Sequence, residues 1–200
     1  LIKGPNGQSG LVRPEVVNQK PGYHWSLGEV EWLIEPQVNP PKSKTAGVGV
    51  SIDFEMRPAR GGSERKLAIL LDGWAFHKNR VGKDLRQRMA LVHSGNWDVW
   101  TFTWADLDEK FNPDSVTPPP ELAVVDSAKF RQVLQHVGLA QHKSLAEQSV
   151  FDWFEAELLG DGLDWKMIGT AALVSRMSPA KPADIEAWTT FVNRAAPTTA

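Results

Sequence analysis

Residues 66–107 constrain the fold of this chain more than any other segment. The segment begins with KLAILLDGW, a short apolar run typical of a buried strand, and continues with an amphipathic stretch from Val81 to Ser94. Residues 97–104, WDVWTFTW, then carry the aromatic and β-branched side chains that favour a strand. A strand, a helix and a strand in this order predict a crossover and a locally parallel pair of strands.

A further strand is expected just before this segment, at residues 48–56, VGVSIDFEM. The hydrophilic turn RPARGGSER separates it from the apolar run, so the two strands are predicted to form an antiparallel hairpin. On the helix, Leu85, Met89 and Val92 share one face. The expected fold is α/β, with a mixed sheet flanked by helices.

The N-terminal part gives weaker patterns. Residues 1–23 carry many breakers and are expected to be a lead or linker. Ser26 and Glu29 have capping-box spacing before apolar residues at helical intervals, which predicts a helix over 27–35. The chain begins with Leu1 rather than Met, so we expect a domain of a longer polypeptide.

Beyond the Pro118–Pro120 run the pattern is helical throughout. Helices are expected at about 127–138, 144–159, 164–177 and 185–195, the last capped by Asp184. The predicted organisation is a lead (1–23), an α/β core (24–110), a linker (111–125) and a C-terminal helical annex (126–200).

Composition excludes several classes of protein. The net charge of -2 gives no global attraction to nucleic acid, so DNA binding would need a local basic patch. The absence of cysteine excludes disulfides and thiolate metal sites and predicts a reducing, cytoplasmic location. No apolar run approaches the roughly 18 residues that cross a bilayer, and neither a GxSxG elbow nor a GxxxxGK[ST] phosphate loop occurs.

Three polar residues could form a site at the strand ends. Pairing of the two hairpin strands would bring Asp53 and Asp72 to one edge of the sheet, where carboxylates suit Mg²⁺ or Mn²⁺. His77 could then act as a general base or stabilise a leaving group. Each residue also has an ordinary interpretation: Asp72 as part of a strand-ending Asp-Gly turn, His77 as a boundary histidine and Asp53 as a solvated strand residue.

Four segments in this order, SIDF, AILLDGWAFH, DLRQRMAL and WDVWTFTWADL, carry a family resemblance. Over about residues 25–107 the chain resembles the very-short-patch-repair endonucleases and related domains of the PD-(D/E)XK restriction-endonuclease-like superfamily. The resemblance implies that Asp53 is the core metal-binding aspartate, Asp72 a second active-site residue beside the metal and His77 the catalytic histidine. A glutamate of the first helix often contributes as well, with Glu31 the better match and Glu29 the weaker.

The chain departs from the family pattern at three places. Leu70 stands where many related domains have a glutamate, Ile52 replaces the proline before the aspartate, and no lysine occupies the usual lysine position near Trp74. Asp84 and Arg88 fall in the helix segment, and their i,i+4 spacing favours a structural ion pair.

The expected function is metal-dependent hydrolysis of DNA by an endonuclease or nickase that uses Mg²⁺ or Mn²⁺. The chain is also similar to C-terminal nuclease-like modules of large bacterial DEAD/DEAH-box helicases, some of them in anti-phage defence, which implies DNA and a helicase body or defence complex as partners. The alternative is a degenerate module that keeps the fold to hold DNA or a protein. The annex aromatics could anchor such a partner or pack in a core; they are Trp153, Phe154, Trp165 and Trp188.

Overall fold

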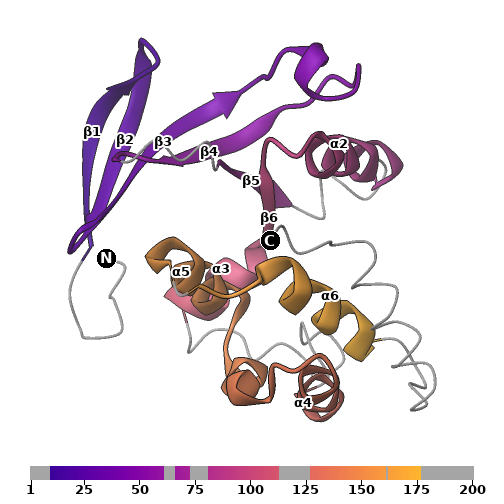
Figure 1. Cartoon of the computed structure of the whole chain (residues 1–200). Coiled ribbons are helices and arrows are strands. Elements are labelled where there is room, and N and C mark those ends of the chain that lie inside the picture. The colour runs from indigo at the N-terminus through magenta and orange to yellow at the C-terminus, as the bar shows by residue number, and fades with distance from the viewer. Residues whose placement is uncertain (1–9, 61–65, 73–80, 113–126, 161, 177–200) are drawn as a thin grey trace. The chain divides into compact units, whose positions relative to one another are not determined.

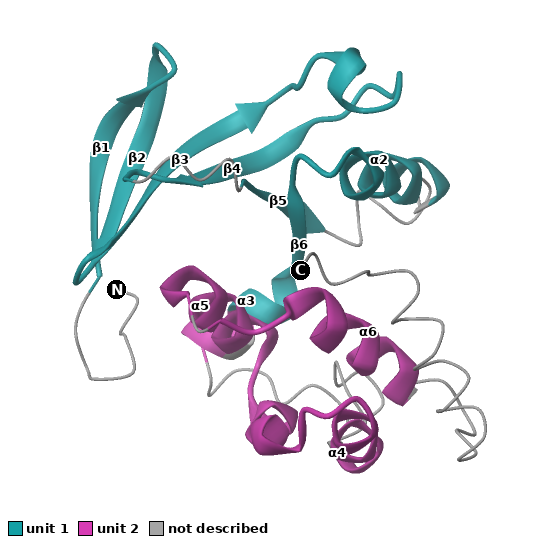
Figure 2. Cartoon of the chain, in the orientation of Figure 1, with its two compact units in different colours: residues 1–107 teal, residues 108–200 magenta. Residues whose placement is uncertain are grey.

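The structure is a computed structural model that describes residues 10–60, 66–72, 81–112, 127–160 and 162–176. The chain divides into two compact units, residues 1–107 and residues 108–200 (Figure 2). Each unit is described separately below. Across the described residues no helix is both long and apolar enough to cross a membrane.

The first unit is built on a six-stranded mixed sheet whose strand order follows the chain (Figure 1). Neighbouring strands are antiparallel except β5 and β6, which are parallel. The expected α/β class with a mixed sheet is therefore confirmed. The strands are β1 (Leu11–Val17), β2 (Lys20–Leu27), β3 (Val30–Val38), β4 (Ile52–Pro58), β5 (Leu67–Asp72) and β6 (Asp98–Thr103), with a short 3₁₀ turn, η1 (Lys42–Lys44), between β3 and β4.

The strand–helix–strand segment has the predicted form. The helix α2 (Val81–Ser94) connects β5 to β6, and the parallel register runs from Leu67 opposite Asp98 to Asp72 opposite Thr103. A buried cluster joins the inner side of α2 to the sheet; it contains Val50, Ile52, Ala68, Leu70, Ala90, Leu91 and Trp97. This cluster fixes α2 against β4 and β5, because each of its apolar side chains would be exposed to water if the helix moved away.

The apolar face expected on α2 is not the face that packs. Leu85, Met89 and Val92 are exposed, whereas Ala90 and Leu91 are buried against the sheet. The expectation is wrong because the packed side of α2 uses a small residue, which lets the helix lie close to β5, together with a single larger apolar side chain.

The helix expected over 27–35 is replaced by two strands. Gly28 and Glu29 form a two-residue turn between β2 and β3, with Gly28 at a φ of 63°. Two-residue hairpin turns favour a glycine at such a φ. Trp25 and Trp32 lie opposite each other across the hairpin and are both buried. This cross-strand pairing overrides the short helical pattern, because a helix could not bury both rings on one sheet face.

The lead expected over 1–23 also contains strands in its described part. Asn18 and Gln19 connect β1 to β2, both at positive φ, as a two-residue hairpin turn of type I′ requires. The Asn18 side chain donates to the Glu35 carboxylate and accepts from Arg57, so this turn is attached to β3 and β4. The strand expected at 48–56 begins later than predicted, at Ile52.

The second unit is helical in its described part, as expected. Its helices are α4 (Ser127–His136), η3 (Ala140–Glu147, a 3₁₀ segment), α5 (Val150–Leu159) and α6 (Trp165–Arg176), and α3 (Trp104–Phe111) spans the boundary between the units. The single helix expected over 144–159 is interrupted before Ser149, whose capping box with Asp152 starts α5. The helix expected at 185–195, with Asp184 and Trp188, lies outside the described residues.

Aromatic side chains form the core of the helical unit. The Trp153 ring lies 5.5 Å from Phe130 and 6.2 Å from Trp165, measured between ring centroids. Trp153 and Phe154 are buried, and the Trp153 indole donates to the Leu145 carbonyl. Of the two roles expected for these aromatic residues, partner anchor or core packing, the structure supports core packing for Trp153 and Phe154.

Gly22 provides a test of the close packing between β1, β2 and β3. A Cβ atom added there would lie 2.5 Å from the Ile34 carbonyl oxygen and 2.9 Å from a Val17 methyl group. We expect Gly22→Ala to lower the free energy of unfolding in urea by about 1–3 kcal/mol, since backbone must move to relieve the overlap. Gly82→Ala is the matched control, because an added Cβ meets nothing within 4 Å there; equal effects of the two substitutions would contradict the prediction.

Candidate functional site

Asp53 lies at the point where β4 and β5 separate. The last residue pair in the ladder between these strands is Phe54 with Ile69. Just beyond it, Asp53 Oδ2 accepts a hydrogen bond of 2.8 Å from the Leu71 backbone N–H. The other oxygen, Oδ1, has a long contact of 3.5 Å with Gln37 Nε2. One oxygen of Asp53 thus accepts a hydrogen bond from a backbone N–H of β5, and the second is held only weakly by its protein partner.

Asp72 is the last residue of β5 and directly follows the residue that Asp53 binds. Its carboxylate forms an ion pair with the Arg88 guanidinium of α2. The sequence favoured a pair between Arg88 and Asp84 on the same helix, whereas the ion pair in the structure joins Arg88 to Asp72. The spacing rule for helices could not find this contact, because it depends on how α2 packs against β5.

Sheet pairing therefore brings Asp53 and Asp72 to the same end of two adjacent strands, as the sequence predicts. Leu70, at the position where the resemblance implies a glutamate, is buried in the cluster beneath α2. His77 lies outside the described residues.

Glu31 is not part of this group. It lies on β3, because the helix expected over 27–35 is replaced by two strands. Its carboxylate pairs with Arg60 at 2.9 Å and with His24 at 3.6 Å. The strand register pairs Pro36 with Phe54 and Val38 with Ile52, so Asp53 lies across from the region of Gln37. Gln37 is six residues along β3 from Glu31, which is about 20 Å along a strand. Glu29, the weaker candidate, lies in the β2–β3 turn.

Two further glutamates, which the sequence did not single out, are buried opposite each other on β3 and β4. Glu35 pairs with Lys20 at 3.3 Å, and Glu55 pairs with Lys66 at 3.0 Å and accepts from the Trp97 indole at 2.8 Å. Each carboxylate thus has its own cation. These contacts satisfy the buried charges and tie the strands together, which is a structural role.

The described residues contain no group of three or more His, Cys, Asp or Glu side chains that could enclose a metal ion. An all-protein cage is therefore not formed by this part of the chain. Mg²⁺ commonly binds through one or two carboxylates and completes its octahedron with water and substrate phosphate oxygens. Asp53 and Asp72 supply two hard oxygen ligands of that kind, so the donor set fits such an ion.

Comparison with known protein families, with curated proteins and with solved structures found no match for this chain.

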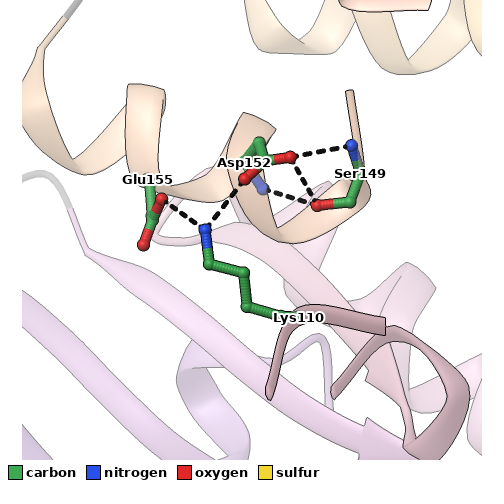
Figure 3. A network of polar contacts seen from close by, with 4 residues as sticks. All are labelled: Lys110, Ser149, Asp152 and Glu155. Atoms are coloured by element: carbon green, nitrogen blue, oxygen red, sulfur yellow. Dashed lines mark hydrogen bonds and ion pairs between the residues drawn. The ribbon is translucent and has the colours of Figure 1, made fainter. Parts of the chain in front are cut away.

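The second unit has a polar network of a different kind, shown in Figure 3. Lys110 Nζ of α3 donates to Asp152 and Glu155 of α5, each at 2.9 Å. Lys110 also lies 5.6 Å from the centre of the Phe151 ring. Asp152 accepts from Ser149 as well, in the capping box of α5. The network joins α3 to α5 through the Lys110 ammonium, which is a structural role.

Opposing effects act on the charges of this network. Burial alone would lower the pKa of Lys110, but its hydrogen bonds to Asp152 and Glu155 outweigh burial and raise the pKa above the ordinary 10.5. Burial alone would raise the pKa of Asp152, but bonds from Lys110 and Ser149 hold it below the ordinary 3.8. Asp152 therefore contributes stability above pH 3.8, and this contribution is lost as the pH falls through its lowered pKa. Lys110 contributes stability below pH 10.5, and this contribution is lost as the pH rises through its raised pKa.

Lys110→Met should lower the free energy of unfolding at neutral pH by at most about 1 kcal/mol, because both partners remain partly solvated. The difference from the parent should shrink as the pH falls below 3.8, since Asp152 then loses the charge that Lys110 binds. Tryptophan fluorescence during thermal unfolding at a series of pH values measures this. The exposed Lys143→Met is the control, and a difference that stays constant down to strongly acid pH would count against the assignment.

Proposed function

We propose that the first unit binds a divalent cation, Mg²⁺ or Mn²⁺, through Asp53 and Asp72 and hydrolyses phosphodiester bonds of DNA. The observation that carries the proposal is the hydrogen bond from Leu71 N–H to Asp53, which holds one carboxylate beside the strand residue that precedes the other. Two carboxylates at one sheet edge are a suitable ligand set for an ion that also contacts a phosphate.

Each residue of the proposed site has a distinct task. Asp53, fixed by the Leu71 N–H, presents its weakly held Oδ1 to the ion, and Asp72 presents its carboxylate from the end of β5. A divalent cation held there would polarise the phosphodiester and lower the pKa of a bound water. His77 is assigned as the general base in this proposal, on the grounds of sequence alone.

The fold gives additional support to the same proposal. The order of an antiparallel hairpin, a crossover helix and a parallel strand in β4, β5, α2 and β6 is the order that the resemblance to restriction-endonuclease-like domains implies. On this basis we further propose that the unit works within a larger machine of the helicase or anti-phage defence type in the cytoplasm, with DNA and other domains of that machine as partners.

A specific observation favours the second candidate, a degenerate module that binds DNA or a protein without cleaving it. Asp72 already has a cationic partner in Arg88, and Leu70 fills with apolar packing the position where a third carboxylate is implied. In this candidate the two aspartates only join β4, β5 and α2.

A nicking assay separates the two candidates. Supercoiled plasmid is incubated with the full chain and Mn²⁺ or Mg²⁺, and conversion to the nicked form is followed. We expect cleavage that requires the metal and that Asp53→Asn and Asp72→Asn each reduce by at least about 100-fold, since each removes the charge of one metal ligand.

Glu15→Gln is the matched control, because Glu15 is an exposed carboxylate on β1. It should cleave as the parent does, and circular dichroism should show all variants folded. Absence of cleavage by the parent, or equal cleavage by parent and both aspartate variants, would exclude the nuclease and leave the binding module.

A further inference from the structure

Among the described residues, Arg88 is a cation in direct contact with one of the proposed metal ligands. Its guanidinium Nη2 is bonded to Asp72 Oδ2, and both side chains are about three-quarters buried, with 25% exposed. Its Nε is buried and has no hydrogen-bond partner among the described residues. The Arg88 head group is therefore linked to the sheet mainly through one contact, the contact with a proposed metal ligand.

The position of Arg88 does not depend on that contact. Its helix neighbours hold α2 in place: Ala90 and Leu91 are buried in the cluster against β4 and β5, and Gln87 Nε2 donates to the Gly49 carbonyl at 2.8 Å. The backbone of α2 would thus stay where it is if the Arg88 head group moved. An arginine on a fixed backbone with a flexible head can exchange one oxyanion partner for another at little cost in fold stability.

The charges of the site show what such an exchange would do. Asp53, Asp72 and Arg88 together carry a net charge of about -1, which a divalent cation changes to about +1 and a bound phosphodiester returns to about 0. Without the arginine, the net charge of the site is about -2; a divalent cation changes it to about 0, and a bound phosphodiester then changes it to about -1. Arg88 thus opposes metal binding alone and favours binding of the metal and a phosphate together.

We propose that Arg88 is a positioning residue that couples metal binding to DNA binding. In the absence of both ligands it holds Asp72; when the metal takes the Asp72 carboxylate, the guanidinium turns to an oxygen of the DNA phosphodiester. This inference rests on the proposed function, because it assumes the metal site at Asp53 and Asp72. It assigns Arg88 the phosphate contact of the site, because Arg88 is partly buried against Asp72 whereas Lys83 and Arg86 of the same helix are exposed.

The test compares Arg88→Met with the parent in two binding measurements. Mn²⁺ affinity is measured by calorimetry without DNA, and affinity for a short fluorescent DNA duplex is measured with and without Ca²⁺, an oxygen-bound ion used in place of Mn²⁺. We expect Arg88→Met to bind Mn²⁺ alone about 3- to 10-fold more tightly, to bind DNA in Ca²⁺ about 10-fold more weakly, and to lose most of the Ca²⁺ dependence of DNA binding.

Arg88→Lys keeps the charge and should retain most of the coupling, and the exposed Arg86→Met is the matched control that should behave as the parent does. If Arg88→Met does not fold, Arg88→Gln replaces it in the same measurements. Parent Mn²⁺ binding that Asp53→Asn and Asp72→Asn do not weaken would overturn the proposed site and this inference together. Metal binding that needs both aspartates but is unchanged by loss of Arg88 would overturn this inference alone.

Discussion

The first unit depends on the two-sided pairing of β5. This strand is antiparallel to β4 and parallel to β6, and its residues Leu67 to Leu70 are buried. Because a parallel neighbour requires a crossover, the chain must leave the sheet after Asp72 and return through α2. The same requirement places Asp72 at a strand end and brings α2, with Arg88, against it. The site and the fold thus follow from one pairing pattern.

The two carboxylate oxygens of Asp53 have different surroundings. One oxygen replaces a backbone acceptor for Leu71 where the β4–β5 ladder ends, and the other is held only by the long contact with Gln37. A carboxylate fixed on one side by a backbone N–H is oriented before any ligand arrives, which reduces the entropy that ligand binding must overcome. Glu35 and Glu55 differ from Asp53, because both carboxylate oxygens of each glutamate have close partners in the protein.

The strand–helix–strand segment could be predicted because each of its elements has a strong local pattern. The β2–β3 hairpin could not, since Leu27, Val30, Leu33 and Ile34 fit helical spacing, and only the pairing of Trp25 with Trp32 across the turn decides for strands. The available signal was Gly28-Glu29 between two runs rich in β-branched and aromatic residues. The contact of Arg88 with Asp72 could not be predicted from the sequence either, because the two residues are far apart in the chain and meet only when α2 packs against β5. That Asp53 and Asp72 lie at the same end of two strands could be predicted, because adjacent strands in a hairpin place their ends together.

The proposed binding of one divalent cation by Asp53 and Asp72 can be tested with crystals grown in Mn²⁺ and measured near the manganese absorption edge. We expect one anomalous peak about 2.1 Å from a carboxylate oxygen of each aspartate. No peak at this edge of the sheet, in crystals whose solvent contains saturating Mn²⁺, or a peak bound to neither aspartate, would contradict it.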